Sequence, residues 1–443
     1  MRSIFLLLLI LPAWGQDALG LRDAVRLALR ENKGLTAAAA GLRAAEERTL
    51  QAHAGKLPKV NYTQSFTRSD NPVFVFSSLL TQHQFSAQNF DLAPLNRPDF
   101  LNNFQSQITV DQVLYDAGQT RNAVKSAELS RQITAEEQRN AQLRVISGVA
   151  QAYYDTLLAA AALKAAEQSV RSTEADLKRA EAIRAAGMST DIDVLSVRVH
   201  LAGVGEQRIN RAADLDIARA ALNDALGLPL DTPHTLTTPL SPLDVPDLAI
   251  ETLEKEAGTA RPEIRQMRAG SELAQTQSDA ARHAMLPQVN FHAGIEADAQ
   301  RVVARGGINW LASVNMKWNV FNGFSDRSQI AESVHRVERA KAEEERAGSS
   351  VRLQVRRAYA ALRAAQQRIE VAKASVAEAE ESLRITQNRY EAGLANVTDL
   401  LRNETAVLDS RTRYLAAVHD QRVAATLLEF SAGRLSVDSE VLN

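Results

Sequence analysis

The residues that could carry chemistry are few in this chain, and their spacing does not fit catalysis. The eight histidines are scattered, and no two lie at metal-ligand spacing on one helical face. The sequence contains no Gly-rich phosphate loop, no nucleophile elbow and no metalloprotease helix. Cysteine is absent, which excludes thiolate metal sites and disulfide staples. We therefore expect a protein that is not an enzyme and that holds no cofactor or metal.

Two aspartates have the most informative spacing. Asp193 follows Gly187, and Asp399 follows Gly393, by the same interval, and a leucine comes two residues after each aspartate. A carboxylate at such a place can simply favour the start of a helix, because a helix N-terminus carries partial positive charge. Any larger role depends on the elements that position the two carboxylates.

The two aspartates occupy matching places in a duplicated chain. Leu-Pro-x-Val-Asn at 57–61 recurs at 286–290, and further along a constant shift of 206 relates Tyr115 to Phe321 and Gly227 to Gly433. Such a constant shift indicates one architecture used twice. We expect a first repeat at 16–228, a Pro-rich linker at 229–247, a second repeat at 248–435 and a tail at 436–443.

Each repeat should contain one very long helix. Residues 120–184 and 326–390 have no proline and almost no glycine, which predicts helices of about 65 residues, or roughly 100 Å. Their apolar residues alternate steps of four and three, as a coiled coil requires. Gly187 and Gly393 then end the long helices, because glycine readily adopts the left-handed conformation found after a helix. Returning helices should end near Leu226 and Leu428.

A shorter helix should open each repeat, from about 21 to 55 and from about 248 to 285. Two strands follow each of these helices, with apolar and polar residues alternating. The last strand is the clearest, with Trp310 and Trp318 on its apolar face and Lys317 on the other. A half-buried soluble sheet has the same period, but strands of about 10 residues with this alternation are also what a membrane barrel needs. In a barrel, Trp310 and Trp318 would lie in the two aromatic girdles.

Four strands cannot form a closed wall in lipid, because the known barrels start at eight strands and an open edge in hydrocarbon is forbidden. Either the strands are not in a membrane, or several protomers share one barrel. Three protomers would supply twelve strands. The loop at about 69–103, rich in Pro, Asn, Gln and Phe, would then face outside and could narrow the mouth.

The first 15 residues have the pattern of a secretory signal peptide. Arg2 precedes the apolar run Ile4–Leu11, and Ala13-Trp14-Gly15 is similar to a cleavage site. The chain carries 51 Lys and Arg against 53 Asp and Glu, so it has no basic field for nucleic acid. We expect an exported protein that does not bind nucleic acid.

The whole pattern resembles the outer membrane efflux proteins, the TolC-like trimeric exit ducts, over nearly all of the mature chain. The resemblance rests on the Leu-Pro-x-Val-Asn motifs, on segments 113–118 and 319–323 after the second strands, and on the two Gly-to-Asp segments. It implies a homotrimer in the outer membrane of a Gram-negative bacterium, with most of its mass in the periplasm. The implied fold is an α+β membrane protein made of a duplicated helix-strand-strand-helix-helix repeat, with a twelve-stranded β-barrel continuous with a long periplasmic α-helical barrel.

The resemblance also assigns roles to single residues. The hairpin tips that contact a periplasmic adaptor would be Gly187, Met188, Ser189, Asp193, Leu195, Gly393, Leu394, Ala395 and Leu401. The inner aperture would be formed by Tyr390, Asp399 and Arg402. Three copies of Asp399 near a threefold axis would make a carboxylate ring that passes or traps cations. Some members carry a second acid where this chain has Arg402, so Asp399 and Arg402 could instead form ion pairs.

The function implied by the resemblance is that of a passive exit duct in a tripartite efflux system. It would take small molecules, such as drugs or metals, from a periplasmic adaptor and an inner-membrane pump of RND, ABC or MFS type. One alternative is the outer-membrane component of type I protein secretion. The alternative from another class is a surface coiled-coil stalk or adhesin, which the apolar strand faces do not favour.

Overall fold

The structure is a computed structural model that describes residues 18–246, 249–302 and 306–443. The expected signal peptide, residues 1–15, lies outside the described residues. The chain divides into two compact units. The first unit comprises Met1–Gly41, Ala135–Gln266 and Glu345–Asn443, and the second comprises Leu42–Thr134 and Met267–Glu344. Within the described ranges, no helix has both the length and the apolar character needed to cross a bilayer.

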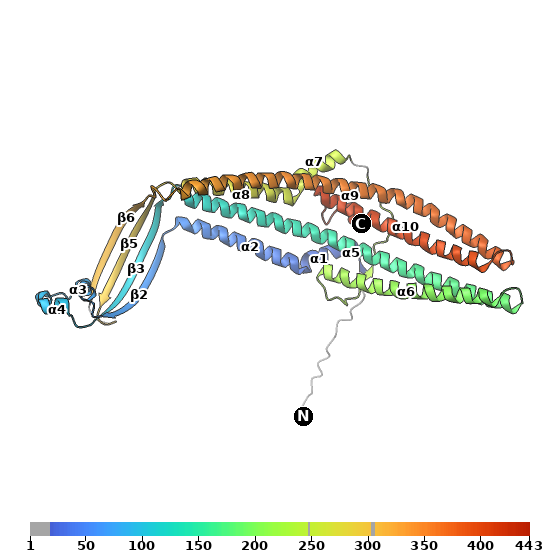
Figure 1. Cartoon of the computed structure of the whole chain (residues 1–443), viewed down its shortest axis with the longest axis horizontal. Coiled ribbons are helices and arrows are strands. Elements are labelled where there is room, and N and C mark those ends of the chain that lie inside the picture. The colour runs from blue at the N-terminus through green and yellow to red at the C-terminus, as the bar shows by residue number, and fades with distance from the viewer. Residues whose placement is uncertain (1–17, 247–248, 303–305) are drawn as a thin grey trace, which may run out of the picture. The chain divides into compact units, whose positions relative to one another are not determined.

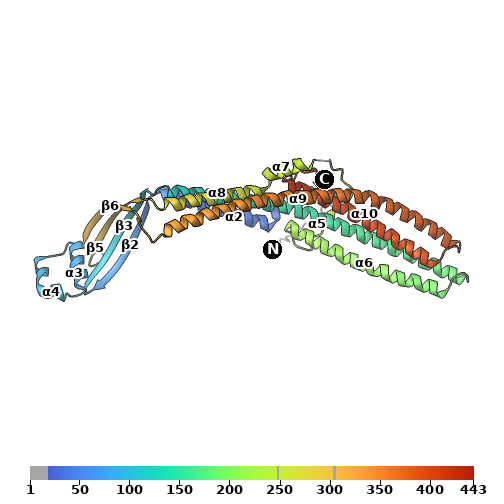
Figure 2. The same cartoon turned by 45° about the horizontal axis from the view of Figure 1, so that its top comes forward.

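The four longest helices form two equal hairpins. Helices α5 (Gln119–Ala185) and α9 (Ser325–Glu391) have 67 residues each, and the returning helices α6 (Asp191–Leu226) and α10 (Val397–Ala432) have 36 each. In both views α6 runs back along the second half of α5, and α10 runs back along the second half of α9 (Figures 1 and 2). The predicted ends of the long helices are correct to within two residues, whereas α10 extends four residues past the predicted Leu428.

The prediction of a single opening helix in each repeat is wrong. The first is divided into α1 (Leu21–Glu31) and α2 (Lys33–His53), and the second into α7 (Ile250–Ala260) and α8 (Pro262–His283). Each break lies against the glycine that ends a returning helix. A Cβ on Gly227 would lie 2.8 Å from the Glu31 carbonyl oxygen, and one on Gly433 would lie 3.0 Å from Ala260. The two glycines, at φ +79° and +75°, therefore allow close contact as well as a left-handed helix end.

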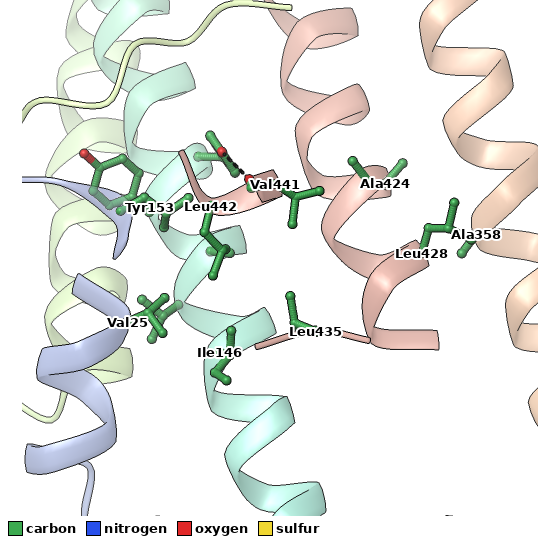
Figure 3. Packing of buried hydrophobic residues seen from close by; sticks show 14 of the residues in the cluster. Val25, Ile146, Tyr153, Ala358, Ala424, Leu428, Leu435, Val441 and Leu442 are labelled. Carbon is green, nitrogen blue, oxygen red and sulfur yellow. Dashed lines mark hydrogen bonds between the residues drawn. The ribbon is translucent and has the colours of Figure 1, made fainter. Parts of the chain in front are cut away.

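The main hydrophobic core belongs to the first unit and joins both repeats. It contains residues of α1, α5, α6, α7, α9, α10 and the C-terminal segment, including Val25, Tyr153, Ala358 and Leu428 (Figure 3). Tyr153 is fully buried, donates its hydroxyl hydrogen to the Leu19 carbonyl (2.8 Å) and accepts from the Thr237 and Thr238 amides. A buried tyrosine needs such partners, because an unsatisfied hydroxyl would oppose its burial.

The segment after α6 is fastened to this core. Its short strand β4 (Thr235–Leu236) pairs in parallel with β1 (Ala18–Leu19). Gln421 exchanges two hydrogen bonds with the Leu243 backbone, and the buried Arg422 donates to the Ser241 carbonyl at 2.8 Å. The 3-10 helix η3 (Glu440–Leu442) buries Val441 and Leu442 in the same core.

The second unit contains one antiparallel sheet of four strands (Figure 1). The strands are β2 (Lys59–Ser69), β3 (Leu101–Tyr115), β5 (Gln288–Ala299) and β6 (Gly307–Lys317), in the order β2-β3-β5-β6. The β3–β5 register shifts between Val113 and Tyr115, which marks a bulge. Strands β2 and β6 are therefore the two edges of the sheet.

Two expectations about the sheet need correction. The last strand ends at Lys317, before the predicted strand residue Trp318, whose indole nitrogen donates to the Met285 carbonyl at 3.1 Å. The segment between β2 and β3 is also more than a loop. It folds into α3 (Pro72–Thr81), the 3-10 helix η2 (Ala87–Phe90) and α4 (Leu92–Asn96).

Candidate functional site

The strand register divides the sheet into an apolar face and a polar face. Residues paired across antiparallel strands share a face. The apolar face carries Val60, Tyr62, Phe66, Phe104, Ile108, Val110, Phe291, Ala293, Ile295, Ile308, Trp310, Ala312, Val314 and Met316. Gln64, Arg68, Asn102, Ser106 and Gln112 are polar exceptions on the same face. Much of this face is open in the single chain, and the Trp310 side chain is 79% exposed. The face is large enough to require either lipid or another protein surface.

The polar face has a hydrogen-bonded pattern of its own. It comprises Asn61, Thr63, Ser65, Thr67, Asn103, Gln105, Gln107, Thr109, Asp111, Asn290, His292, Glu296, Asp298, Asn309, Ser313, Asn315 and Lys317. Across the strands Gln105 donates to Glu296 at 3.1 Å, and His292 lies 2.7 Å from Asp111. Leu311 is an exposed exception on this face. A hydrated lining would suit these side chains.

The tip between α5 and α6 is closed by a capping box. Gly187 has φ +79°, and nothing lies within 4 Å of where its Cβ would be. The Asp193 carboxylate accepts hydrogen bonds from the Ser189 hydroxyl (2.7 Å) and from the amide and hydroxyl of Thr190 (3.0 and 2.9 Å). These bonds, above all the one from the Thr190 amide, lower the pKa of Asp193. Asp193 therefore serves as a cap in this chain, while Met188 and Leu195 are exposed.

The tip between α9 and α10 has the same backbone and different polar contacts. Gly393 has φ +71° with open space around it, and the cap is Asn396, whose side chain accepts from the Asp399 amide at 2.8 Å. The Asp399 carboxylate is thus left free of capping. It lies 3.6 Å from Arg402, whose side chain is 74% exposed, while the Asp399 side chain is 45% exposed.

A small apolar cluster joins the two tips. It contains Ala180, Val194, Val197, Tyr390, Val397 and Leu400, with Ala395 and Leu401 packed against it. Tyr390 is buried rather than exposed, and no hydrogen-bond partner lies near its hydroxyl within the part of the chain that the structure describes. Burial, together with the nearby Asp193 and Asp176 carboxylates, raises the pKa of Tyr390. Of the predicted aperture residues, Asp399 and Arg402 are accessible in the single chain and Tyr390 is not.

A buried acidic cluster next to the tips was missed by sequence reasoning. Asp176 on α5 and Glu404 on α10 are both almost fully buried. Glu404 accepts from Ser172 (2.8 Å) and Thr173 (3.2 Å), and His200 on α6 lies 3.6 Å from it. One oxygen of Asp176 pairs with Arg179, which also contacts Glu391 of α9 at 3.1 Å.

Among the described residues, no hydrogen-bond donor lies within reach of the second oxygen of Asp176. Burial and the neighbouring Glu404 carboxyl group raise the pKa of Asp176 to about 8. The cluster therefore brings one carboxyl group from each hairpin into the same buried site. A signal for it was present in the sequence, because Val397, Leu400, Glu404 and Val407 have coiled-coil spacing and Glu404 occupies a position where an apolar residue is usual.

No metal centre accompanies these groups: within residues 18–246, 249–302 and 306–443, no cluster of three or more His, Asp or Glu side chains is arranged to hold a metal ion. Over residues 24–228 and 253–434 the sequence matches the family model described as outer membrane efflux protein. The chain belongs to the outer membrane efflux protein family.

Known proteins in this group agree with that assignment. Protein CyaE of Bordetella pertussis is 27% identical over 341 residues, which cover 76% of this chain and 72% of that protein. The proteases secretion protein PrtF of Dickeya chrysanthemi is 24% identical over 98% of this chain and 93% of its own. The fold is similar to that of the Campylobacter jejuni CmeC outer membrane channel, with a TM-score of 0.80, 16% identity and coverage of 97% and 92%.

Outer membrane efflux proteins are channels of the outer membrane of Gram-negative bacteria, and this protein belongs in that membrane. They are export channels rather than a class of enzymes, which agrees with the absence of a catalytic arrangement in the sequence. Membership in a channel family also removes the support for a surface stalk or adhesin.

Proposed function

We propose that this outer membrane efflux protein is a homotrimeric exit duct. Its three sheets would form one twelve-stranded barrel, with the helical hairpins continuing the wall into the periplasm. The observation that carries the proposal is the sheet, which combines an uncovered apolar face with two unpaired edge strands. Exposed strand edges in lipid cost several kcal/mol for each unpaired backbone group, so a neighbour must pair with them.

The strand geometry supports this arrangement. Edge strands β2 and β6 have 11 residues each, so each spans about 36 Å at 3.3 Å per residue. With a tilt of about 40° the height is roughly 28 Å, close to the apolar band of about 25 Å in outer-membrane barrels. Since neighbouring strands alternate in direction, β6 of one protomer and β2 of the next would also be antiparallel.

The tips are the proposed inner gate and docking surface. A periplasmic adaptor would contact the segments around Gly187 and Gly393, where Met188, Leu195 and Leu394 present exposed apolar side chains. Three Asp399–Arg402 pairs would line the aperture, and the adaptor would open it by drawing the hairpins apart. Energy would come from an inner-membrane pump.

The proposal is tested by purification from membranes. We expect the protein to be extracted only with detergent, as a trimer that dissociates on heating, and to form ion-conducting pores in planar bilayers. Replacing Ile295 with Asp should prevent stable insertion, because it places a charge on the apolar face, whereas Glu296→Gln on the polar face should have little effect. A water-soluble monomer without pore activity would reject the proposal.

We infer that the cargo consists of small molecules, as in tripartite efflux, with protein secretion as the second candidate. The family description as efflux proteins favours the first, and the likeness to a proteases secretion protein favours the second. Deleting the gene and measuring both drug or metal tolerance and the secreted protein profile separates them. Unchanged tolerance with a lost secreted protein would favour secretion.

A further inference from the structure

The inserted segment between β2 and β3 distinguishes the two repeats. It contains α3, η2 and α4, whereas in the second repeat β5 ends at Ala299 and β6 already begins at Gly307. Helix α3 is well defined at its start, because the Asn71 side chain accepts from the Val73 and Phe74 amides and Pro72 fits the first turn. Three phenylalanines, Phe76, Phe85 and Phe90, then pack edge to face with centroids 4.7 and 5.1 Å apart. The insertion is thus a folded element.

One side of α3 is held to the sheet by a buried chain of amides. Val75, Ser78 and Gln82 lie on this side and are buried, Gln82 to 1% exposure. The Gln82 side-chain nitrogen donates to the Asn103 side-chain oxygen at 2.8 Å and to the Asn102 carbonyl at 3.1 Å. Asn103 in turn donates to Asp298 at 2.6 Å. The contact therefore extends from α3 across β3 to β5.

A second set of contacts ties α3 to β6. Asn309 donates its side-chain hydrogen to the Thr81 carbonyl at 3.0 Å, and its oxygen lies 3.2 Å from the His83 ring nitrogen. The backbones approach closely here, since a Cβ on Gly307 would come within 1.9 Å of the Thr81 carbonyl oxygen. Only glycine permits this contact.

The sheet residues in these contacts lie on the polar face. Asn103, Asp298 and Asn309 belong to it, and Gly307 is paired with Asp298 and shares it. The apolar face, in contrast, stays open at the same end, where Phe66 and Ile308 are exposed. Helix α3 therefore covers the polar face at one end of the sheet. This end is opposite the one where the strands connect to the helices α2, α5, α8 and α9.

We propose that the insertion is an outer constriction of the duct that sets the upper size of its cargo. The inference rests on the proposed trimeric barrel, in which the polar face lines the water-filled interior. Each protomer would then place one α3 inside the outer mouth. The periplasmic tips and this insertion would be two separate gates.

The sizes involved make the constriction severe. Twelve strands about 4.8 Å apart and tilted by about 40° enclose a circle about 24 Å across. A helix with its side chains is about 10 Å wide, and three such helices side by side need a circle of about 22 Å. Three copies of α3 would nearly fill the mouth, so a folded or bulky cargo would require α3 to leave its contacts with Asn103 and Asn309.

The experiment measures access to the duct from outside, which does not depend on the state of the inner gate. Because the chain has no cysteine, Ser313→Cys provides a single reporter on the polar face. Intact cells are treated with a small charged maleimide or with one whose head is roughly as wide as a helix. We expect the small reagent to label Cys-bearing trimers readily and the bulky reagent to react at least tenfold more slowly.

Two changes should remove this difference. Replacing residues 72–96 with a short Gly-Ser linker, or introducing Gln82→Ala, should raise the rate for the bulky reagent at least tenfold and fivefold respectively. The matched control Gln88→Ala, at an exposed position of the same insertion, should leave it unchanged. Equal bulky-reagent rates with and without the insertion, in trimers that the small reagent labels, would overturn the constriction. Failure of the small reagent to label, or absence of trimers, would instead count against the barrel itself.

Discussion

The two hairpin tips have the same backbone and different electrostatics. Gly187 and Gly393 turn the chain with nearly the same φ, and each returning helix starts at a polar cap. In the first tip the carboxylate of Asp193 accepts hydrogen bonds in the helix cap. In the second tip Asn396 caps the helix, and the Asp399 carboxylate lies beside Arg402 instead. The two tips thus share a fold, and in the second tip the aspartate carboxylate takes no part in the helix cap.

The buried acidic cluster also differs between the two repeats. Positions that match Asp176 and Glu404 in the other repeat hold Ser382 and Arg198, which make separate contacts on the surface. The buried pair of carboxyl groups therefore lies at the contact of α10 with α5 and α6. In the proposed ring of six hairpins, this contact would differ chemically from the one between protomers.

The largest expected effect comes from titrating this cluster. The pKa of Asp176 is raised by burial, so the stability it contributes is present at low pH and is lost as the pH rises from about 4 through about 8. We expect the closed tips to lose a few kcal/mol over this range, because each unit of pKa shift corresponds to about 1.4 kcal/mol. Hydrogen exchange of α5 and α10 at several pH values measures the change.

Two partly buried histidines, His200 beside the cluster and His419 further along α10, should make smaller contributions to the pH dependence of stability. Burial lowers the pKa of His200, which works against the cluster below about pH 6.5. For His419, burial alone would lower the pKa, but hydrogen bonds with Asp155 and Asp420 raise it, so its contribution to stability is also lost with rising pH.

Asp176→Asn should remove most of the pH dependence of stability, and the control Ser382→Asn should not. A wild-type slope retained in Asp176→Asn would show that the cluster does not control opening.

Substituting the glycine at either turn should have an effect of intermediate size on adaptor binding and efflux, and the effect should be equal for the two tips. A β-branched residue at φ near +75° costs about 2 kcal/mol, and both sites have open space, so the cost is purely local. We expect Gly187→Val and Gly393→Val to leave the trimer assembled while abolishing adaptor binding and lowering efflux at least tenfold. Gly203→Ala, inside α6 and also open, serves as the control. Normal efflux in Gly393→Val would remove the docking role from that tip.

The smallest changes in stability are expected from replacing the two aspartates, Asp193 and Asp399, and these variants test how the roles of the two differ. Asp193→Ala should lower local stability by about 1 kcal/mol through loss of the cap, with little change in ion selectivity. Asp399→Ala should cost about 0.5 kcal/mol or less, since the ion pair with Arg402 is exposed, yet change the cation preference of single channels. Arg402→Ala should strengthen that preference. Identical selectivity in all three variants would leave Asp399 without a role in the aperture.

The sequence by itself determined the elements of this protein. Regular apolar spacing and the absence of proline define α5 and α9, because a helix this long needs a continuous partner surface. Alternation defines the strands, and Gly187 and Gly393 define the turns, because these signals act over a few residues. The predicted girdle residue Trp318 shows the limit of such signals, since its alternation continues after β6 has ended at Lys317.

Only the tertiary structure decided which distant residues meet. The helix breaks at Asn32 and Arg261 lie where Gly227 and Gly433 approach the backbone. In the first repeat, no local sequence pattern indicates this break. Asp176 and Glu404 are 228 positions apart, and so are Thr81 and Asn309, which are joined by a hydrogen bond. Burial, the raised pKa of Asp176 and the covering of the polar face depend on which distant residues lie close together in space. Sequence periodicity reports only which side of its own helix or strand a residue occupies.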